Sequence, residues 1–528
     1  MAEEPRQAPG TVLARPLRWA EDRLHLSAGL HAQLNKVFPE RWSFLLGELA
    51  LYSFVVLLLT GTYLSLFFDP SMTEVTYHGD YTLADGSVMS RAFASTLDLS
   101  FDVRGGLLVR QIHHWAALVF VAAIIVHLLR IFFSGAFRRP REANWVIGLL
   151  MLVLAIVEGF TGYSMPDDLL SGTGLRITSG IILSIPVVGS WLHWLVFGGE
   201  FPGDQIIPRL FTVHILLLPG LLIVLVAVHL GLVWRQKHTQ VRAPQRTERN
   251  VVGTRIVPTF AAKSIGLFIS VAAVLTLLGG IFQINPIWNY GPYSPLQGSA
   301  GSQPDWYIAW VDGAARLWPA WEITLGGHRV PAPFWATVVM PAAVFALAFC
   351  YPWIERRLTG DRAHHNLLDR ARDAPVRSAL GAMALTFFAI LLLTGFNDII
   401  ALTFSLDLDV VVWAGRFAIL LLPPAAYALT YRVCHGLQTG DRKILSEGIE
   451  TGIVVRRADG RFVEIHQPLG ERTENGEREE VPYAGAPVPR RMNQLGAAGT
   501  ALPGGLLLPD PQKESEDLRR ARSNEADS

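Results

Sequence analysis

Four histidines on two long apolar segments are the residues in this chain best suited to chemistry. His113 and His127 share one segment, and His214 and His229 share another. Ionisable side chains inside membrane segments are costly and usually mark function. Two such pairs call for a buried partner that uses imidazole nitrogen, and haem iron is the obvious one. A single histidine in an apolar segment is more often a hydrogen-bonded core residue, so it is the pattern of four that favours haem.

The spacing within each pair determines which helical faces the histidines occupy. Fourteen residues separate His113 from His127, which places them roughly 21 Å apart on one face. Fifteen residues separate His214 from His229, roughly 60° out of phase on an ideal helix. Pro219-Gly220 lies between them and can bend or rewind that helix. Parallel helices would then oppose His113 with His214, named here the outer pair, and His127 with His229, the inner pair.

The doublet His113-His114 leaves one ligand position ambiguous. His114 is thirteen residues from His127 and lies further round the helix. His113 is therefore the expected ligand, with His114 as the alternative.

The elements that position these residues are predicted to be membrane helices. The chain has 528 residues, of which 51% are hydrophobic and only 17% charged, a composition typical of integral membrane proteins. Runs of about twenty apolar residues can span a bilayer. The predicted fold is an all-α integral membrane protein, with a four-helix bundle for two haems (A to D), helices E to H and a polar C-terminal tail. Eight spans, A to H, are expected at 43 to 67, 107 to 133, 145 to 164, 209 to 234, 263 to 284, 334 to 354, 377 to 397 and 410 to 431.

The loops predict an orientation in the cell membrane. Loops after spans B, D and F are rich in arginine, whereas those after A, C, E and G carry few basic residues. By the positive-inside rule, the basic loops and both termini are expected in the cytoplasm. The first forty residues are polar and contain no signal-peptide pattern. The expected regions are 1–42, an N-terminal segment; 43–262, the haem-binding region; 263–434, the C-terminal helices; and 435–528, a cytoplasmic tail.

Composition also limits the partners and cofactors. The formal net charge is zero, so nothing suggests a nucleic-acid partner. Cys350 and Cys434 are far apart and form neither a haem-attachment motif nor an iron–sulfur motif, so any such centre must belong to another chain. The tail is polar and expected to be ordered in part at best. Its apolar run Leu506–Leu508 either docks on a partner or is incidental.

Glycines repeat the spacing of the histidines. Gly47 and Gly61 on span A, and Gly148 and Gly162 on span C, are again fourteen residues apart. Glycine lets a flat macrocycle approach a backbone closely, although small residues also serve helix packing in lipid. Because the spacing equals that of the ligands, haem contact is the favoured interpretation.

Three arginines lie where haem propionates would be expected. Arg110 precedes His113 by three residues, Arg130 follows His127 by three, and Arg209 precedes His214 by five. A guanidinium near a helix end can pair with a carboxylate, and the alternative is simple extension of the side chain toward the membrane surface.

The chain resembles cytochrome b of the respiratory cytochrome bc complex, the quinol:cytochrome c oxidoreductase. The resemblance covers about residues 40 to 432, and its eight spans in one chain match the fused form of the family. The fifteen-residue spacing on span D and the C-terminal extension are similar to the forms of high-GC Gram-positive bacteria, which use menaquinol. The motifs that carry it are RQIH at Arg110–His113, NWVIG at Asn144–Gly148, GYSMP at Gly162–Pro166 and PDWY at Pro304–Tyr307.

The resemblance implies an electron-transferring enzyme with two b haems, which also places Trp145 near a haem. Quinol is oxidised at an outer site, with one electron passing to a Rieske iron–sulfur protein and the other to the outer haem. The second electron crosses to the inner haem and reduces a quinone at an inner site, which generates proton motive force. The implied partners are the Rieske protein, a c-type cytochrome, a second copy of the chain, the lipid bilayer and, as an option, a terminal cytochrome c oxidase.

The resemblance also assigns the quinone sites. PDWY is the counterpart of the family's PEWY, whose carboxylate is a proposed quinol ligand and proton acceptor. Asp305 is one methylene shorter than glutamate, and capping a helix is its alternative role. The inner site departs further, since Trp234 or Arg235 stands where the family often has a histidine. The expected outer-site residues are Pro304, Asp305, Trp306, Tyr307, Tyr163, Pro166 and Gly174, with Asp305, Tyr307 and Tyr163 catalytic; those of the inner site are Glu48, Lys263 and Ser264.

Two other function classes remain as alternatives. A dihaem b-type anchor of a dehydrogenase or hydrogenase would pass electrons to quinone at a single site, but such anchors need only about four or five helices and no PDWY-like pocket. A secondary transporter would use intramembrane His and Arg to relay protons without haem. A colourless purified protein would favour the transporter.

Overall fold

The computed structural model describes residues 23, 33–243, 245–297, 303–469, 481–488, 491–492 and 498–499. Within this part of the chain, eight helical segments are long and apolar enough to cross a membrane, as expected. Most of 1–42 and the run Leu506–Leu508 lie outside the described residues. The segments are α3 (Leu46–Ser65), α5 (Gly106–Ser134), α6 (Glu142–Tyr163), α9 (Ile206–Thr212) with η3 (Val213–Leu217) and α10 (Leu218–Gln236), η4 (Ile256–Phe260) with α11 (Ala261–Ile281), α14 (Ala332–Phe334) with η5 (Trp335–Val339) and α15 (Met340–Thr359), α16 (Pro375–Thr394) and α18 (Leu408–Glu447).

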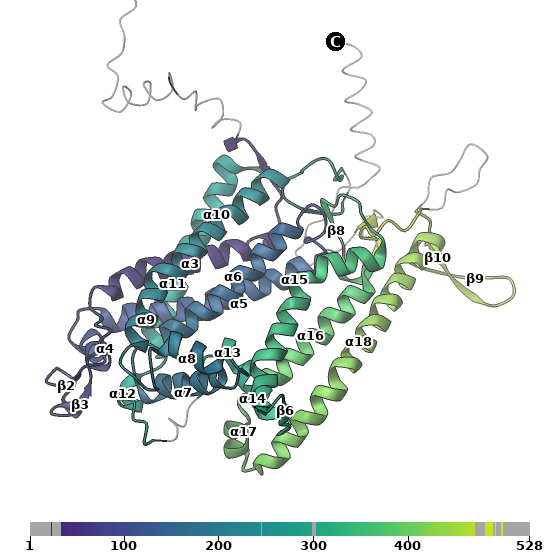
Figure 1. Ribbon diagram of the computed structural model, residues 1–528. Helices are drawn as coiled ribbons and strands as arrows, with labels where there is room; N and C mark the ends of the chain where they lie inside the picture. Colours follow the sequence, from purple (N-terminus) through teal and green to yellow (C-terminus); the bar gives the residue numbers. More distant parts are fainter. Residues whose placement is uncertain are drawn as a thin grey trace, which may run out of the picture. The chain divides into compact units, whose positions relative to one another are not determined.

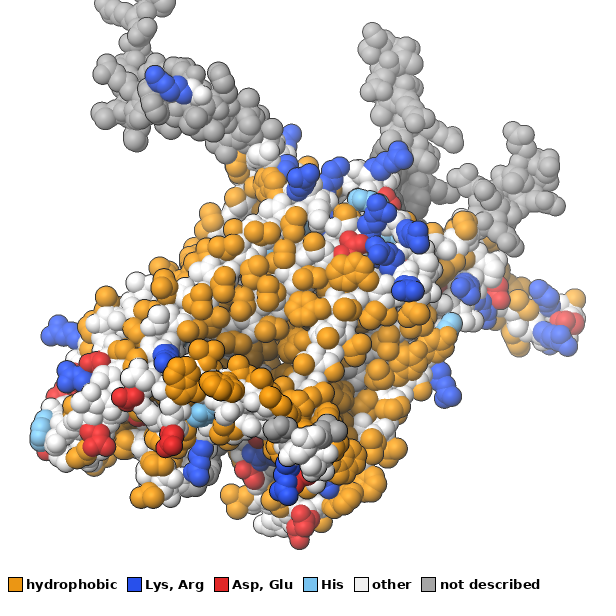
Figure 2. Space-filling view, in the orientation of Figure 1, with side chains coloured by type: hydrophobic (Ala, Val, Ile, Leu, Met, Phe, Trp, Pro, Cys, Tyr) orange, Lys and Arg blue, Asp and Glu red, His pale blue; other side chains and the backbone are white. Residues whose placement is uncertain are grey.

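The surfaces of these helices fit a lipid environment. Between 6% and 33% of the residues in each most apolar stretch are buried inside the protein. A water-soluble protein would bury such stretches, because large exposed apolar patches are rare on soluble monomers. Figure 2 shows the hydrophobic side chains spread along the outer flanks of the long helices. The chain is therefore an integral membrane protein, and these helices face lipid.

Shorter helices and hairpins connect the spans. Asp168 caps α7 through a capping box with Ser171, and Asp407 caps α18 by accepting from the N–H of Asp409, which satisfies donors at the starts of these helices. The short helices are α4 (Arg91–Phe101), α7 (Leu169–Leu183), α8 (Gly189–Phe197), α12 (Ile287–Tyr290), α13 (Trp306–Leu317) and α17 (Asn397–Phe404). The paired strands include β1 (Val37–Phe38) with β5 (Thr254–Arg255), β2 (Glu74–Thr76) with β3 (Val88–Ser90), β6 (Ile323–Leu325) with β7 (His328–Val330), β9 (Ile449–Arg456) with β10 (Phe462–Gln467), and β11 (Arg491–Met492) with β12 (Ala498–Gly499).

The chain divides into two compact units, which are described separately. The first comprises residues up to 130, 137–240 and 248–366; the second comprises 131–136, 241–247 and 367 onward. Helices α11 and α15 therefore lie in the same compact unit as α3, α6 and α10. In the first unit, α10 packs against α6 and α11 against α3 (Figure 1).

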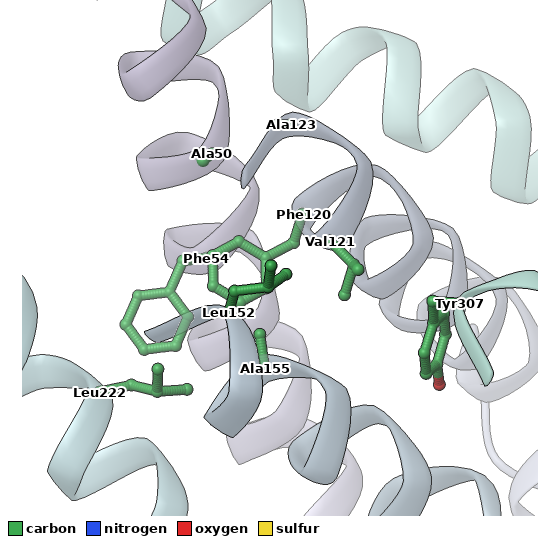
Figure 3. Packing of buried hydrophobic residues seen from close by; sticks show 9 residues of the cluster. All are labelled: Ala50, Phe54, Phe120, Val121, Ala123, Leu152, Ala155, Leu222 and Tyr307. Atoms are coloured by element: carbon green, nitrogen blue, oxygen red, sulfur yellow. The ribbon is translucent and has the colours of Figure 1, made fainter. Parts of the chain in front are cut away.

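The core of the first unit lies between the two histidine pairs. Phe120 is halfway between His113 and His127 on α5, and its ring stacks on Phe54 of α3 with centroids 5.3 Å apart. Leu222 of α10 is completely buried in the same cluster. Figure 3 shows these side chains gathered between α3, α5, α6 and α10. This packing holds the four helices together and separates the outer pair from the inner pair.

The second unit is built on two long antiparallel helices. Helix α16 packs along α18, which runs on to Glu447 rather than ending near residue 431. Strands β9 and β10 follow as an antiparallel hairpin. Asp441 is 1% exposed and forms salt bridges with Arg370 and Arg372. The described part of the expected tail therefore begins as ordered structure.

Candidate functional site

The helices α5 and α9–η3–α10 bring the four histidines together in two pairs. The ring centroids of His113 and His214 are 6.3 Å apart, with the ring planes at 72°. Those of His127 and His229 are 6.5 Å apart, at 70°. A metal ion bound by two imidazole nitrogens at about 2 Å each would separate the ring centres by about 6 Å. The two helices are therefore parallel, and each pair has the separation that one haem iron requires.

A π-helical turn corrects the fifteen-residue spacing on the second helix. The turn is η3 (Val213–Leu217), which contains His214, and the N–H of Leu218 donates to the carbonyl of Val213 five residues earlier. Such a turn accommodates one extra residue in an α-helix. Fifteen residues therefore advance the helix about as far as fourteen would elsewhere. The correction expected at Pro219-Gly220 is instead made in the preceding turn.

The glycines give an independent test of whether haem fits. A Cβ at Gly162 would lie 2.6 Å from Cε1 of His214, and one at Gly61 would lie 3.1 Å from Cε1 of His113. At Gly47 the same contact, 3.1 Å, is with His127. A Cβ at Gly148 would meet no described atom within 4 Å, so this glycine borders open space. Three of the four glycines thus contact histidine rings, and the fourth lies beside open space. This arrangement fits a macrocycle at each pair.

Two of the three arginines expected near propionates lie close to the histidine pairs. Nη2 of Arg110 donates to the carbonyl of Asn285 at 2.8 Å, while its Nη1 is buried without a hydrogen-bond partner among the described residues. An unsatisfied buried donor is costly, and a haem carboxylate would relieve it. The guanidinium of Arg130 lies 4.4 Å from the centre of the Phe44 ring.

Arg209 and Trp145 make contacts that the sequence did not predict. Nη1 of Arg209 donates to the carbonyl of Leu195 at 2.6 Å, near the C-terminal end of α8. Cations at helix C-termini are favourable because carbonyl groups there lack partners. Nε1 of Trp145 donates to the carbonyl of Ala348 and links α6 to α15. In the described structure, Arg209 therefore supports a helix end, and Trp145 joins two helices.

The outer quinone-site prediction converges on Asp305. Although Asp305 precedes the first residue of α13, its side chain makes no capping hydrogen bond. Instead, Nε2 of His114 lies 3.1 Å from both carboxylate oxygens, and the hydroxyl of Tyr307 donates to Oδ2 at 3.1 Å. Burial and the nearby carboxylate raise the pKa of Tyr307, so its phenol stays protonated and donates. Asp305 is therefore part of a buried polar cluster rather than a helix cap.

His114 is the residue at this site that the sequence did not assign. It appeared only as the alternative to His113, because the doublet offers two imidazoles one residue apart. In the structure the two side chains have different partners. The His113 ring faces the His214 ring, whereas Nε2 of His114 lies next to the Asp305 carboxylate. Adjacent residues on a helix point about 100° apart, so a doublet can serve two neighbouring sites.

One cavity of about 320 Å³ joins the outer pair to this polar cluster. Its lining includes His113, His214, Asp305 and Tyr307. A volume of this size is typical of a small-molecule pocket. Tyr163 and Pro166 also line it, whereas Gly174 lies behind, with a Cβ there reaching 3.3 Å from Cε1 of Tyr163. Pro304 and Trp306 flank Asp305 in the chain but do not line the cavity.

Two adjacent carboxyl groups near the cavity were not identified from the sequence. Asp168 lines the cavity and caps α7, and Asp167 precedes it with a left-handed backbone, φ 55°. Burial raises the pKa of Asp167 from its ordinary value to about 7, and neighbouring Asp168 adds to the shift while the Ser90 hydroxyl opposes it. Burial also raises the pKa of Asp168.

The raised pKa of Asp167 predicts a loss of stability with increasing pH. Between about pH 4 and pH 7 the folded protein holds a proton that the unfolded chain has released, so the free energy of unfolding falls through this window and levels off above it. Each pKa unit corresponds to about 1.4 kcal/mol. Asp167→Asn should flatten the profile, since asparagine also tolerates the left-handed backbone. Thermal unfolding of the purified protein from pH 4.5 to 8 measures this, with exposed Asp204→Asn as the control; equal slopes for Asp167→Asn and the parent would contradict it.

The expected inner-site residues Glu48 and Ser264 also meet. The Ser264 hydroxyl donates to Oε2 of Glu48 at 2.7 Å, and the hydroxyl of Tyr52 donates to the same oxygen at 3.3 Å. Lys263 is directed elsewhere and forms a salt bridge with Glu40. The structure thus adds Tyr52 to this cluster.

His238 is a further residue of the inner region. The family's histidine position is occupied by Trp234 or Arg235, but the His238 ring packs between Phe38 and Phe44, with centroids 4.5 and 4.4 Å away. Its Nδ1 lies 2.7 Å from the carbonyl of Thr239, and burial lowers its pKa to about 4. The side chain is neutral at physiological pH. No sequence spacing pointed to it, because it lies beyond the end of α10.

Comparisons with known proteins agree with this architecture. The family model described as cytochrome b(N-terminal)/b6/petB matches residues 118–292. A solved structure titled hyperthermophilic respiratory Complex III aligns with a TM-score of 0.58 and 22% identity, covering 79% of this chain and 99% of that chain. This similarity supports the fold.

Relatives match nearly the full chain, including the C-terminal extension. A cytochrome bc1 complex cytochrome b subunit from Mycobacterium leprae is 59% identical over 98% of this chain and 94% of its own length. The corresponding subunit from Corynebacterium efficiens is 54% identical over 93% and 91%, and that from Streptomyces coelicolor is 48% identical over 89% and 87%. This level of identity, over nearly the full length of both chains, establishes that the chain belongs to the family of cytochrome b subunits of cytochrome bc1 complexes.

Proposed function

We propose that this chain is the catalytic subunit of a quinol:cytochrome c oxidoreductase, oxidising quinol in the cavity beside Asp305 and reducing quinone near Glu48. The observation that carries the proposal is the shared cavity: Asp305, held by His114 and Tyr307, opens into the same space as the outer pair. A proton acceptor and an electron-acceptor site must both be near a quinol for its two-electron, two-proton oxidation.

Asp305 would accept a proton from a quinol hydroxyl. Donation from His114 and Tyr307 to its oxygens keeps the carboxylate oriented in an apolar wall, and these contacts would be remade as the proton arrives. The Tyr163 side chain lines the same space and bounds the quinol ring. Haem bound at the outer and inner pairs supplies electron transfer across the membrane, with His113, His214, His127 and His229 as iron ligands.

The inner cluster is suited to quinone reduction. Glu48 accepts hydrogen bonds from Ser264 and Tyr52, which hold its carboxyl group in place to relay a proton to a quinone. Because Lys263 pairs with Glu40, we assign it to the rim of the site rather than to quinone contact. Quinol oxidation on one side and quinone reduction on the other would then generate proton motive force.

The quinone and the partners follow from the resemblance to high-GC Gram-positive forms. Menaquinol is the proposed substrate, and a Rieske iron–sulfur protein and a c-type cytochrome are the electron-accepting partners of such a complex. We further propose a homodimer in the plasma membrane, with both termini in the cytoplasm and association with a terminal cytochrome c oxidase. The arginine-rich loops after spans B, D and F support this orientation.

Two alternatives predict different properties. A dihaem anchor would not need a polar cavity next to its outer pair, and a secondary transporter would not need four histidines at iron-binding separations.

A redox-titrated difference spectrum of the purified complex, with pyridine haemochrome quantitation, tests the proposal. Two b haems per chain with separate midpoints are expected, together with menaquinol-dependent reduction of a c-type cytochrome. One haem or none would overturn the assignment of the four histidines. Two haems without quinol:cytochrome c activity in the intact complex would favour the dihaem anchor.

A further inference from the structure

The two histidine pairs differ in the polar groups that lie next to the Nδ1 atoms of their rings. On the outer pair, Nδ1 of His113 lies 2.9 Å from the hydroxyl oxygen of Thr60. That hydroxyl donates its single proton to the carbonyl of Val56 at 2.7 Å. The Thr60 oxygen is therefore an acceptor, and the proton between the two side chains belongs to Nδ1 of His113.

The same arrangement recurs on His214. Its Nδ1 lies 3.1 Å from the Thr161 hydroxyl, which donates to the carbonyl of Glu158 at 2.8 Å. Two more oxygens face this nitrogen, the carbonyl of Glu158 at 3.1 Å and its carboxylate Oε1 at 3.3 Å. Both outer histidines thus carry the proton on Nδ1 and leave Nε2 free to bind iron.

The inner pair lacks these acceptors. Nδ1 of His127 and of His229 is buried and makes no hydrogen bond within ordinary distance and angle limits in the described part of the chain; the polar group facing His229 is the backbone carbonyl of Asn144. The sequence carries the difference. Threonine precedes Gly61 and Gly162 at the outer pair, whereas Leu46 precedes Gly47 and Ile147 precedes Gly148 at the inner pair.

We propose that Thr60 and Thr161, together with Glu158, are positioning residues that hold the outer pair in one tautomer and make haem bound there harder to reduce than it would be without these acceptors. An acceptor on Nδ1–H makes an imidazole a stronger donor to its metal, which favours the more highly charged oxidised iron. This inference rests on the proposed function.

The test is an equilibrium redox titration of the b haems in the intact complex with Thr60→Val. Valine keeps the shape of threonine and removes the acceptor oxygen. At a fixed potential, the ratio of reduced to oxidised outer haem should rise about tenfold, which is about 59 mV for one electron. The inner midpoint should not move. Thr60→Ser, which retains the hydroxyl, should keep the parent midpoint.

Thr276→Val on α11 is the matched control. The Thr276 hydroxyl is exposed, lies outside the cavity lining and donates to the carbonyl of Ala272, so its loss should leave both midpoints unchanged. Should Thr60→Val fail to assemble, the double variant Thr161→Val with Glu158→Leu, which removes both side-chain acceptors that face Nδ1 of His214, carries the same expectation. Parent midpoints in these variants, with two b haems retained, would overturn the inference and leave the proposed function intact. A parent protein without b haems would overturn the proposed function itself.

Discussion

Alanine at His113 is expected to reduce the haem content of the chain from two to one, whereas alanine at the adjacent His114 leaves two. The His113 ring faces His214 across the separation that an iron ion needs, and the His114 ring faces Asp305 instead. Without His113, only His214 would hold the iron at the outer pair, and an unfilled space would remain beside Gly61, where the His113 ring now packs.

Pyridine haemochrome quantitation per chain, on purified complexes, distinguishes the two variants. They are matched in helix, depth and substitution, so a general loss of packing in α5 would affect both. The difference spectrum should lose the component assigned to the outer pair in His113→Ala only. Two haems in His113→Ala, or one in His114→Ala, would show that the doublet is used the other way round.

Hydropathy was sufficient to predict the eight spans, because a membrane helix must satisfy its backbone internally over about twenty apolar residues. Helix α18 is the exception in extent. It continues to Glu447 through polar sequence, where salt bridges from Arg370 and Arg372 to buried Asp441 support it. Those partners come from a distant part of the chain, so local composition could not reveal them.

The histidine pattern predicted the pairing in space, but not how the second helix achieves it. A π turn at Val213–Leu217 inserts one residue without leaving a mark in the hydropathy of the segment. Because Pro219 lies nearby, the irregularity was expected one turn later than the π turn. Spacing arguments specify which side chains must meet, whereas the backbone irregularity that lets them meet depends on packing against neighbouring helices.

The polar partners of the outer site were missed for a similar reason. His114, Asp167 and Thr60 are ordinary residues in the sequence, and each acquires its role from a partner on another element or from burial. Arg209 was likewise expected to face a propionate from its position near His214, and its contact with the carbonyl of Leu195 at the end of α8 could not be foreseen from that position. Proximity in sequence does not fix the direction of a long side chain.

Asparagine at Asp305 is expected to slow quinol oxidation about a hundredfold or more, the range found for removing a general base. The amide has the size of the carboxylate and can still accept from His114 or Tyr307, but it cannot take a proton. Quinol binding and both haem spectra should therefore be nearly unchanged, and the loss should appear in kcat rather than KM. Glutamate at the same position, the family's usual residue, should retain activity.

Steady-state menaquinol:cytochrome c turnover of the intact complex measures this, alongside the haem spectrum of each variant. Asp85→Asn is the matched control, because Asp85 also pairs with a histidine, His78 at 2.8 Å, but on the exposed surface. Its loss should leave turnover at the parent value. Parent turnover in Asp305→Asn would instead mean that Asp305 only holds His114 and Tyr307 in place. The quinol proton would then pass to another group lining the cavity, and Asp168 is the candidate because it is also a carboxyl group.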